Sequence, residues 1–131
     1  CRIILPNFFR EVISMDLTPY VKDELRVLGI TPKYCGYMQS ILAVELILED
    51  ETRLLNITKE VYWKVADLGG CNRCDLERNL RTISRRAWKV NPARLEEIAG
   101  YPLASPPTAS EFVTILATHI QRTYPQYAAP L

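Results

Sequence analysis

Proline positions divide this chain into segments of helical length. Threonine or asparagine stands directly before proline at three places: Thr18-Pro19, Thr31-Pro32 and Asn91-Pro92. Each pair favours a helix start, because the first residue can cap free backbone N–H groups and proline lacks a donor that the first turn would leave unpaired. Gly29 and Gly100 follow where helices would end. The pattern predicts helices joined by short turns.

Six helical segments follow from such signals. They begin at Thr18, Thr31, Thr58, Asn72, Asn91 and Thr108 or Ser110. No segment shows the alternation of a strand, so we predict an all-α, six-helix fold. The chain has 131 residues, about one domain. We expect the helical domain over 16–124, an N-terminal arm or linker remnant at 1–15 and a C-terminal tail at 125–131.

The composition argues against several classes of protein. No apolar run approaches the roughly 20 residues of a membrane span, and four irregularly spaced cysteines do not resemble a secreted disulfide framework. We expect a cytoplasmic protein that is not an enzyme, with no catalytic residues and no cofactor. Glu96 and Glu97 are adjacent and would point apart on a helix, so we do not expect them to form an acid–base pair. We expect His119 to cover a helix surface, and Trp63 and Trp88 to anchor the core.

The segment from Cys71 to Lys89 combines an apolar stripe with a row of arginines. On a helix its apolar residues share one side: Leu76, Leu80, Ile83 and Ala87. Three arginines lie within about 60° of each other on the opposite side: Arg78, Arg81 and Arg85. Six basic residues face two acidic ones in this segment, although the whole chain carries a net charge of only +1. Such a row is typical of a solvated helix face or of a surface for an anionic partner.

The residues before this row favour a helix-turn-helix made by the third and fourth helices. Ala66 is small where the helices would cross, Gly70 can adopt positive φ in the turn, and Leu76 anchors the second helix. The N-terminal half of that second helix meets base edges in the major groove. We predict Arg78 and Arg81 as base readers, because guanidinium can donate two hydrogen bonds to guanine. The alternative is a protein-interaction module whose arginines bind an acidic partner.

Cys71 and Cys74 form a C-x-x-C pair. A structural zinc site needs four ligands, so zinc would require other residues to converge on the pair: Cys1, Cys35 and His119. A redox dithiol would need a thioredoxin-like βαβ pattern around it, which this chain lacks. We therefore predict no metal site. We expect Cys71 to fill the turn and Cys74 to lie at the helix start, with its thiol exposed.

Four blocks of the sequence resemble a known family. They read, in order, "GITPKYCGYMQSILAVELILED", "NITKEVYWKVAD", "LERNLRTISRRAW" and "GYPLASPPTASEFVTILATHI". The resemblance runs from about Leu17 to Thr123 and is to the DNA-binding effector domain of the stage-zero sporulation protein A family, response regulators of endospore-forming Firmicutes. It implies six helices, with the fourth, about 72–89, as recognition helix. It also implies double-stranded DNA as partner, bound as a homodimer or tandem protomers, a receiver domain upstream, and a nucleoid-associated location.

The resemblance also implies site residues. The family's reading motif E-R-x-x-R falls on Glu77, Arg78 and Arg81, and the start of the third helix, Thr58 and Lys59, would lie near phosphates. We assign base reading to Arg78 and Arg81 and tuning of the preference to Glu77. The remaining expected DNA contacts lie along the fourth helix: Arg73, Cys74, Thr82, Arg85 and Lys89.

Some positions depart from the family pattern. Cys74 and Asp75 stand where the family usually has small polar residues and a basic one, and Thr82 stands where it often has histidine. The loop at 101–110 contains no Lys or Arg. Asp75 places a negative charge where phosphates should lie. Each missing phosphate contact reduces the salt slope of binding by about 0.9, so we expect weaker binding and an altered sequence preference.

Overall fold

The computed structural model describes residues 15–69 and 72–123, and these residues form helices and connecting turns without any strand. The predicted all-α class is confirmed. The α-helices are α2 (Met15–Val27), α3 (Gly36–Glu49), α4 (Trp63–Gly69), α5 (Arg73–Val90), α6 (Pro92–Ala99) and α7 (Ala109–Thr123). A 3₁₀ helix, η2 (Glu51–Asn56), and a π-helical turn, η3 (Thr58–Tyr62), connect α3 to α4. Predictions for the arm, the tail, Gly70 and Cys71 lie almost entirely outside the described residues.

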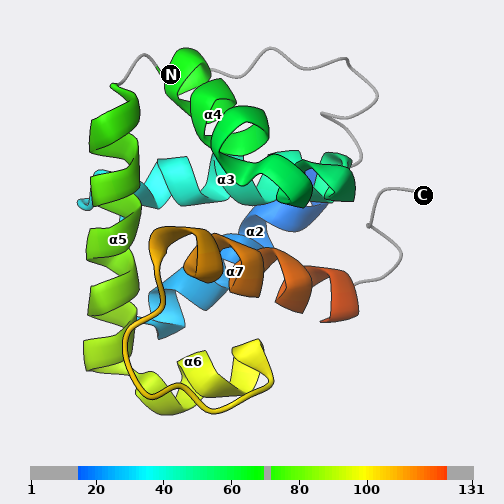
Figure 1. Ribbon diagram of the computed structural model, residues 1–131. Helices are drawn as coiled ribbons and strands as arrows, with labels where there is room; N and C mark the ends of the chain where they lie inside the picture. The colour runs from blue at the N-terminus through cyan, green and yellow to red at the C-terminus, as the bar shows by residue number, and fades with distance from the viewer. Residues whose placement is uncertain (1–14, 70–71, 124–131) are drawn as a thin grey trace.

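The core lies around α3, which contacts both α5 and α7. Ile47 of α3, Leu80 of α5 and Phe112 of α7 are fully buried. Burial of each such side chain contributes roughly 1.5–3 kcal/mol to folding. Figure 1 shows α5 standing along one edge of the molecule, with α4 near its N-terminal end and α6 near its C-terminal end. One long face of α5 is thereby left on the outside.

The predicted division of α5 into two faces is confirmed. The four stripe residues, Leu76, Leu80, Ile83 and Ala87, have no exposed surface. The helix begins after Asn72, whose side-chain oxygen accepts a hydrogen bond from the Cys74 amide at 2.8 Å. This cap satisfies one of the free N–H groups of the first turn. The apolar stripe fixes the rotation of α5, so the arginine side faces solvent.

The last two helices also begin where the sequence predicts. Asn91 accepts a hydrogen bond from the Arg94 amide at 3.2 Å, and α6 ends at Gly100, whose φ is 83°. Thr108 and Glu111 cap α7 reciprocally. The Glu111 amide donates to the Thr108 hydroxyl at 3.2 Å, and the Thr108 amide donates to the Glu111 carboxylate at 3.0 Å. Such a capping box fixes the helix start through local contacts.

The predicted start of the first helix is wrong. The helix α2 already includes Met15, so Pro19 lies inside it and not at its first position. Thr18 does not cap the helix, because its hydroxyl donates a hydrogen bond to the Glu45 carboxylate of α3 at 2.8 Å. The Thr18 side chain therefore makes a tertiary contact with α3 and not the local capping contact that the sequence pattern predicted.

The predicted start of the second helix is also wrong. Residues 31–35 form turns, with the Tyr34 amide donating to the Thr31 carbonyl at 3.1 Å, and α3 begins at Gly36. A Cβ at Gly36 would lie 2.7 Å from the Asn79 carbonyl oxygen of α5. Only glycine permits this close approach. Packing against α5, which the local sequence does not reveal, therefore determines where α3 starts.

His119 does not merely cover a helix surface, which corrects the prediction. Its Nε2 lies 3.1 Å from the Glu24 carboxylate of α2, and the His119 side chain is only 18% exposed. Arg94 of α6 donates two hydrogen bonds to the same carboxylate, at 2.7 and 2.8 Å. Burial alone would raise the pKa of Glu24, but these hydrogen bonds and charges lower it to about 2. The cluster connects α2, α6 and α7.

Candidate nucleic-acid interface

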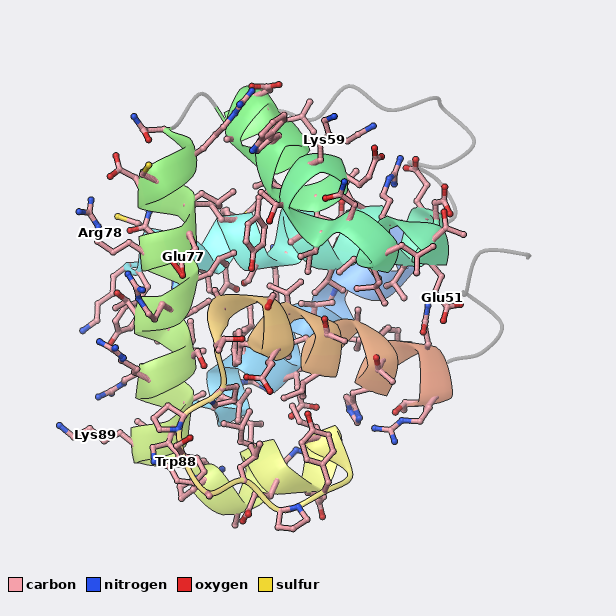
Figure 2. The ribbon with its side chains drawn as sticks, viewed as in Figure 1. Glu51, Lys59, Glu77, Arg78, Trp88 and Lys89 are labelled. Carbon is pink, nitrogen blue, oxygen red and sulfur yellow. The ribbon has the colours of Figure 1, made fainter. Side chains whose placement is uncertain are left out.

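The outer face of α5 is basic and open to solvent. The Arg78 side chain is 66% exposed and that of Arg81 is 43% exposed. Figure 2 shows Arg78 and Lys89 pointing away from the fold at different heights along the helix, while Glu51 lies on the opposite side of the molecule. Cationic side chains on an exposed helix edge form a surface that attracts anions.

A groove runs beside the N-terminal half of α5. It has a volume of about 500 Å³ and lies between α5 on one side and η3 with the first residue of α4 on the other. Its lining residues are Thr58, Tyr62, Trp63, Arg73, Cys74, Glu77, Arg78 and Arg81. The structure thus brings most of the predicted contact residues together. Tyr62 and Trp63 also line the groove, although they are not among the contact residues predicted from the sequence.

The two predicted base readers are held by carboxylates of their own helix. Arg78 lies 2.5 Å from Asp75, and Arg81 lies 3.6 Å from Glu77. Both pairs are substantially exposed, and such pairs contribute only about 0–1 kcal/mol. The guanidinium groups are therefore restrained without being buried. In the free protein Asp75 thus has a partner, the Arg78 guanidinium group.

Trp63 is the centre of a cluster of cations. The guanidinium carbon of Arg73 lies 3.9 Å from the centroid of the indole ring, and Nζ of Lys59 lies 5.9 Å from it. Both distances fall within the range of cation–π attraction. Trp63 also packs against the core, as predicted. The spacing of Lys59 and Trp63 is that of helix neighbours, whereas nothing in the sequence indicates the Arg73 contact.

Tyr62 forms the inner wall of the groove and is 7% exposed. Burial, together with the neighbouring Glu77 carboxylate, raises the pKa of the Tyr62 hydroxyl to about 12. The hydroxyl therefore stays protonated at neutral pH. This places a neutral aromatic wall behind the charged side chains that line the groove.

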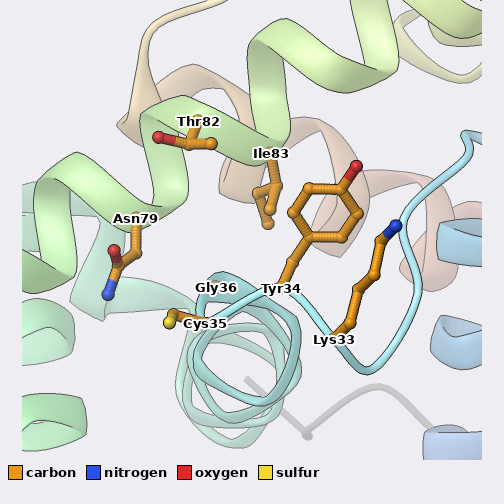
Figure 3. A pocket seen from close by; sticks show the side chains of 7 residues that line it. All are labelled: Lys33, Tyr34, Cys35, Gly36, Asn79, Thr82 and Ile83. Atoms are coloured by element: carbon orange, nitrogen blue, oxygen red, sulfur yellow. The ribbon is translucent and has the colours of Figure 1, made fainter.

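Four predicted contacts are not among the residues that line this groove, and one of them, Lys59, lies beside it at the Trp63 ring. Thr82 lines a second groove of about 250 Å³ on another side of α5, with Lys33 and Asn79 (Figure 3). Its hydroxyl donates to the Arg78 carbonyl at 2.9 Å. Arg85 lines a hollow beside the proline-rich loop. Lys89 is exposed near the C-terminal end of α5. The predicted site therefore extends over more than one side of the helix.

The loop before α7, at 101–108, packs against α5. The buried Ser84 hydroxyl donates to the Pro107 carbonyl at 2.7 Å. The hollow between the loop and α5 is lined by Glu77, Arg81, Arg85 and the residues from Pro106 to Ala109. The loop without basic residues is thus a direct neighbour of the arginine row, and of the described residues that line the hollow only Arg81 and Arg85 of α5 are positively charged.

Three other residues were considered for metal or acid–base chemistry: Cys74, Glu96 and Glu97. Cys74 is a free, exposed cysteine, as predicted. Within residues 15–69 and 72–123, no three His, Cys, Asp or Glu side chains are grouped so as to hold a metal ion. Glu96 accepts a hydrogen bond from the Leu103 amide, and Glu97 pairs with Arg94.

Of the helices described, none is long and apolar enough to cross a membrane.

The family of the chain follows from a comparison of its sequence with known families. The family model described as "Sporulation initiation factor Spo0A C terminal" matches residues 21–120 of the chain. These residues extend from α2 into α7 and include the groove. No solved structure gives a significant match. The matched family consists of DNA-binding effector domains of sporulation regulators. The chain therefore belongs to the family of the Spo0A C-terminal domain.

Proposed function

We propose that this protein binds double-stranded DNA sequence-specifically, with the N-terminal half of α5 in the major groove. The observation that carries the proposal is the groove that gathers Arg73, Arg78 and Arg81 on an exposed helix edge in a member of this family. An α-helix fits the major groove of B-form DNA, where base pairs present distinct donors and acceptors.

In this proposal α4 and α5 are the two helices of a helix-turn-helix. Its support is the contact of both α4 and η3 with α5, and the burial of Ala66 and Leu76, which are 2% and 0% exposed. A small residue at the crossing and an apolar anchor under the second helix suit a unit of this kind. The apolar stripe of α5 turns inward, which leaves the arginine side for DNA.

Arg78 and Arg81 are the proposed base readers. A guanidinium group can donate to guanine O6 and N7 together, and Glu77 can accept from a cytosine amine. For these contacts the ion pairs with Asp75 and Glu77 must rearrange. The small free energy of exposed ion pairs makes that rearrangement inexpensive relative to a good bidentate contact, about 1–3 kcal/mol.

The other predicted residues would hold the DNA backbone. Arg73 is the first residue of α5, and Lys59 of η3 shares the Trp63 ring with it, whereas Arg85 and Lys89 lie farther along the exposed side of α5. Phosphate contacts of this kind set register and orientation without reading sequence. Thr58 and Cys74 line the same groove as Arg78 and Arg81, and Thr82 would lie at the margin of the contact. We further propose assembly as a homodimer or as tandem protomers on DNA, in the cytoplasm, within a protein that carries an upstream receiver domain.

A binding titration after selection from random duplexes tests this function. We expect Arg78→Ala and Arg81→Ala each to reduce discrimination between the selected site and mixed DNA by about 10- to 100-fold. Lys89→Ala should weaken binding to both DNAs equally, as loss of a phosphate contact does. Absence of duplex binding at low salt would contradict the proposal and favour the interaction with an acidic protein partner.

A further inference from the structure

We propose that Trp63 is a positioning residue that holds Arg73 and Lys59 in place for one run of DNA phosphates. The inference rests on the proposed function, since it concerns the same interface. It assigns a role to an aromatic side chain that touches the groove but carries no charge or hydrogen-bonding pattern for reading bases. The ligand is the phosphodiester backbone of a duplex.

The local backbone brings the indole ring to the groove. Trp63 follows the π-helical turn η3, and its amide donates to the Thr58 carbonyl five residues earlier. A π turn inserts an extra residue into a helix and changes the direction of the side chains that follow. Lys59, four residues before Trp63, lies on the same side of the helix, with its ammonium group over the ring.

Arg73 reaches the same ring from the first position of α5. Its guanidinium carbon lies over the ring, 3.9 Å from the centroid, which is close enough for the two planar groups to stack. A guanidinium group donates its hydrogen bonds within its own plane, so stacking on an aromatic ring leaves these donors available for phosphate oxygens. Trp63 therefore orders Arg73 without using the groups that would bind DNA.

The cations at Trp63 differ from those farther along α5. Arg78 and Arg81 each pair with a carboxylate, whereas no ion pair of Arg73 or Lys59 is found among the described residues. Within residues 15–69 and 72–123, no carboxylate therefore neutralises their positive charge by pairing with it. They also lie near the N-terminus of α5, where the helix dipole favours anions. Both features suit phosphate binding.

Ordering the two side chains in advance reduces the cost of binding. A flexible, rotamer-rich side chain loses conformational freedom when it is immobilised at an interface. Because Trp63 already restricts Arg73 and Lys59, part of that loss occurs on folding. The benefit should be the same on every DNA sequence, since phosphates carry no base identity.

A double-mutant cycle with duplex DNA tests this role. Fluorescence anisotropy would compare Trp63→Leu, Arg73→Ala and the double variant on a selected site and on mixed DNA. We expect Trp63→Leu to weaken binding about three- to fivefold on both DNAs, the change expected for a cation–π contact. The double variant should bind more tightly than the product of the single effects implies, because both changes remove one coupled unit.

The salt dependence separates positioning from direct contact. Arg73→Ala should reduce the slope of log K against log salt by about 0.9, since a phosphate contact is lost. Trp63→Leu should leave the slope nearly unchanged, because both cations remain. Trp88→Leu is the matched control: Trp88 lies near the other end of α5 (Figure 2), and we expect its loss to leave DNA affinity unchanged once the protein is folded.

Fluorescence gives a readout if Trp63→Leu fails to fold. In a Trp88→Phe background Trp63 is the sole tryptophan of the chain, and Arg73→Ala should shift its emission. An unchanged emission, or binding effects that multiply exactly in the cycle, would overturn the positioning role while leaving the proposed function intact. Failure of the unmodified protein to bind any duplex would instead refute the proposed function itself.

Discussion

Replacement of Asp75 by asparagine should tighten DNA binding. The Asp75 carboxylate lies 2.5 Å from the Arg78 guanidinium group, with side chains 49% and 66% exposed, respectively. In the proposed complex this carboxylate occupies a position close to phosphates and also neutralises a base reader. Asparagine has nearly the same shape and no charge, so the substitution removes both unfavourable effects without creating a cavity.

The expected magnitude follows from the exposure of the pair. An exposed ion pair contributes at most about 1 kcal/mol. Removing the pair with Asp75 should therefore raise the affinity for DNA through Arg78 by no more than about fivefold. Relief of repulsion with the backbone adds to this, and we expect binding about three- to tenfold tighter near 0.1 M salt. Asp75 also lies in the first turn of α5. Its replacement should lower the free energy of unfolding by roughly 0.3–1 kcal/mol through lost interaction with the helix dipole.

The assay is a duplex titration at several salt concentrations, together with thermal unfolding. Asp23→Asn is a matched control, because Asp23 pairs with Arg26 at the same helical spacing, at 3.3 Å and on the surface of α2. We expect this control to leave DNA affinity unchanged. Weaker binding by Asp75→Asn, or a gain no larger than that of Asp23→Asn, would refute the placement of Asp75 beside phosphates.

Further predictions concern the scaffold and the groove. Glu24 has a pKa of about 2 in the fold, against an ordinary value of 4.5, so its stabilising contribution is present above pH 4.5 and is lost as pH falls toward 2. Glu24→Gln should flatten this loss in acid-unfolding curves and destabilise the protein at pH 7 by on the order of 3 kcal/mol. An unchanged acid transition would contradict the cluster's role. Gly36→Ala should lower the free energy of unfolding by about 1–3 kcal/mol in denaturant titrations, because the new methyl group meets the Asn79 carbonyl at 2.7 Å. A bulky maleimide on Cys74, in a variant whose other cysteines are replaced by serine, should abolish duplex binding, and bound duplex should slow the labelling; equal labelling rates with and without DNA would count against the interface.

The sequence predicted helices best where local contacts determine their ends. The caps at Asn72, Asn91 and Thr108 use side chains within three residues of the groups they satisfy. The starts of α2 and α3 were predicted wrongly because distant contacts decide them. Thr18 bonds to Glu45 across two helices, and Gly36 must lie against α5. The π turn before α4 has no sequence signature that distinguishes it from an ordinary helix.

The candidate site was predictable to the extent that it lies on one helix. The period of α5 separates Arg78 and Arg81 from the buried stripe, and the structure agrees. The pairing of Arg78 with Asp75 could also have been inferred, since residues three apart are neighbours on a helix. The role of Trp63 could not, because Arg73 reaches the ring from another helix. Such a contact depends on the crossing of α4 and α5.

The most direct test of DNA reading by α5 removes single major-groove acceptors from the DNA. In a selected site, each guanine is replaced in turn by deazaguanine, which lacks the N7 acceptor that guanidinium groups use. We predict that at one or two positions the unmodified protein loses about tenfold in affinity, and that Arg78→Ala or Arg81→Ala shows no further loss at the same position. Equal sensitivity of these variants and the unmodified protein, or no sensitivity at any guanine, would contradict major-groove reading by α5.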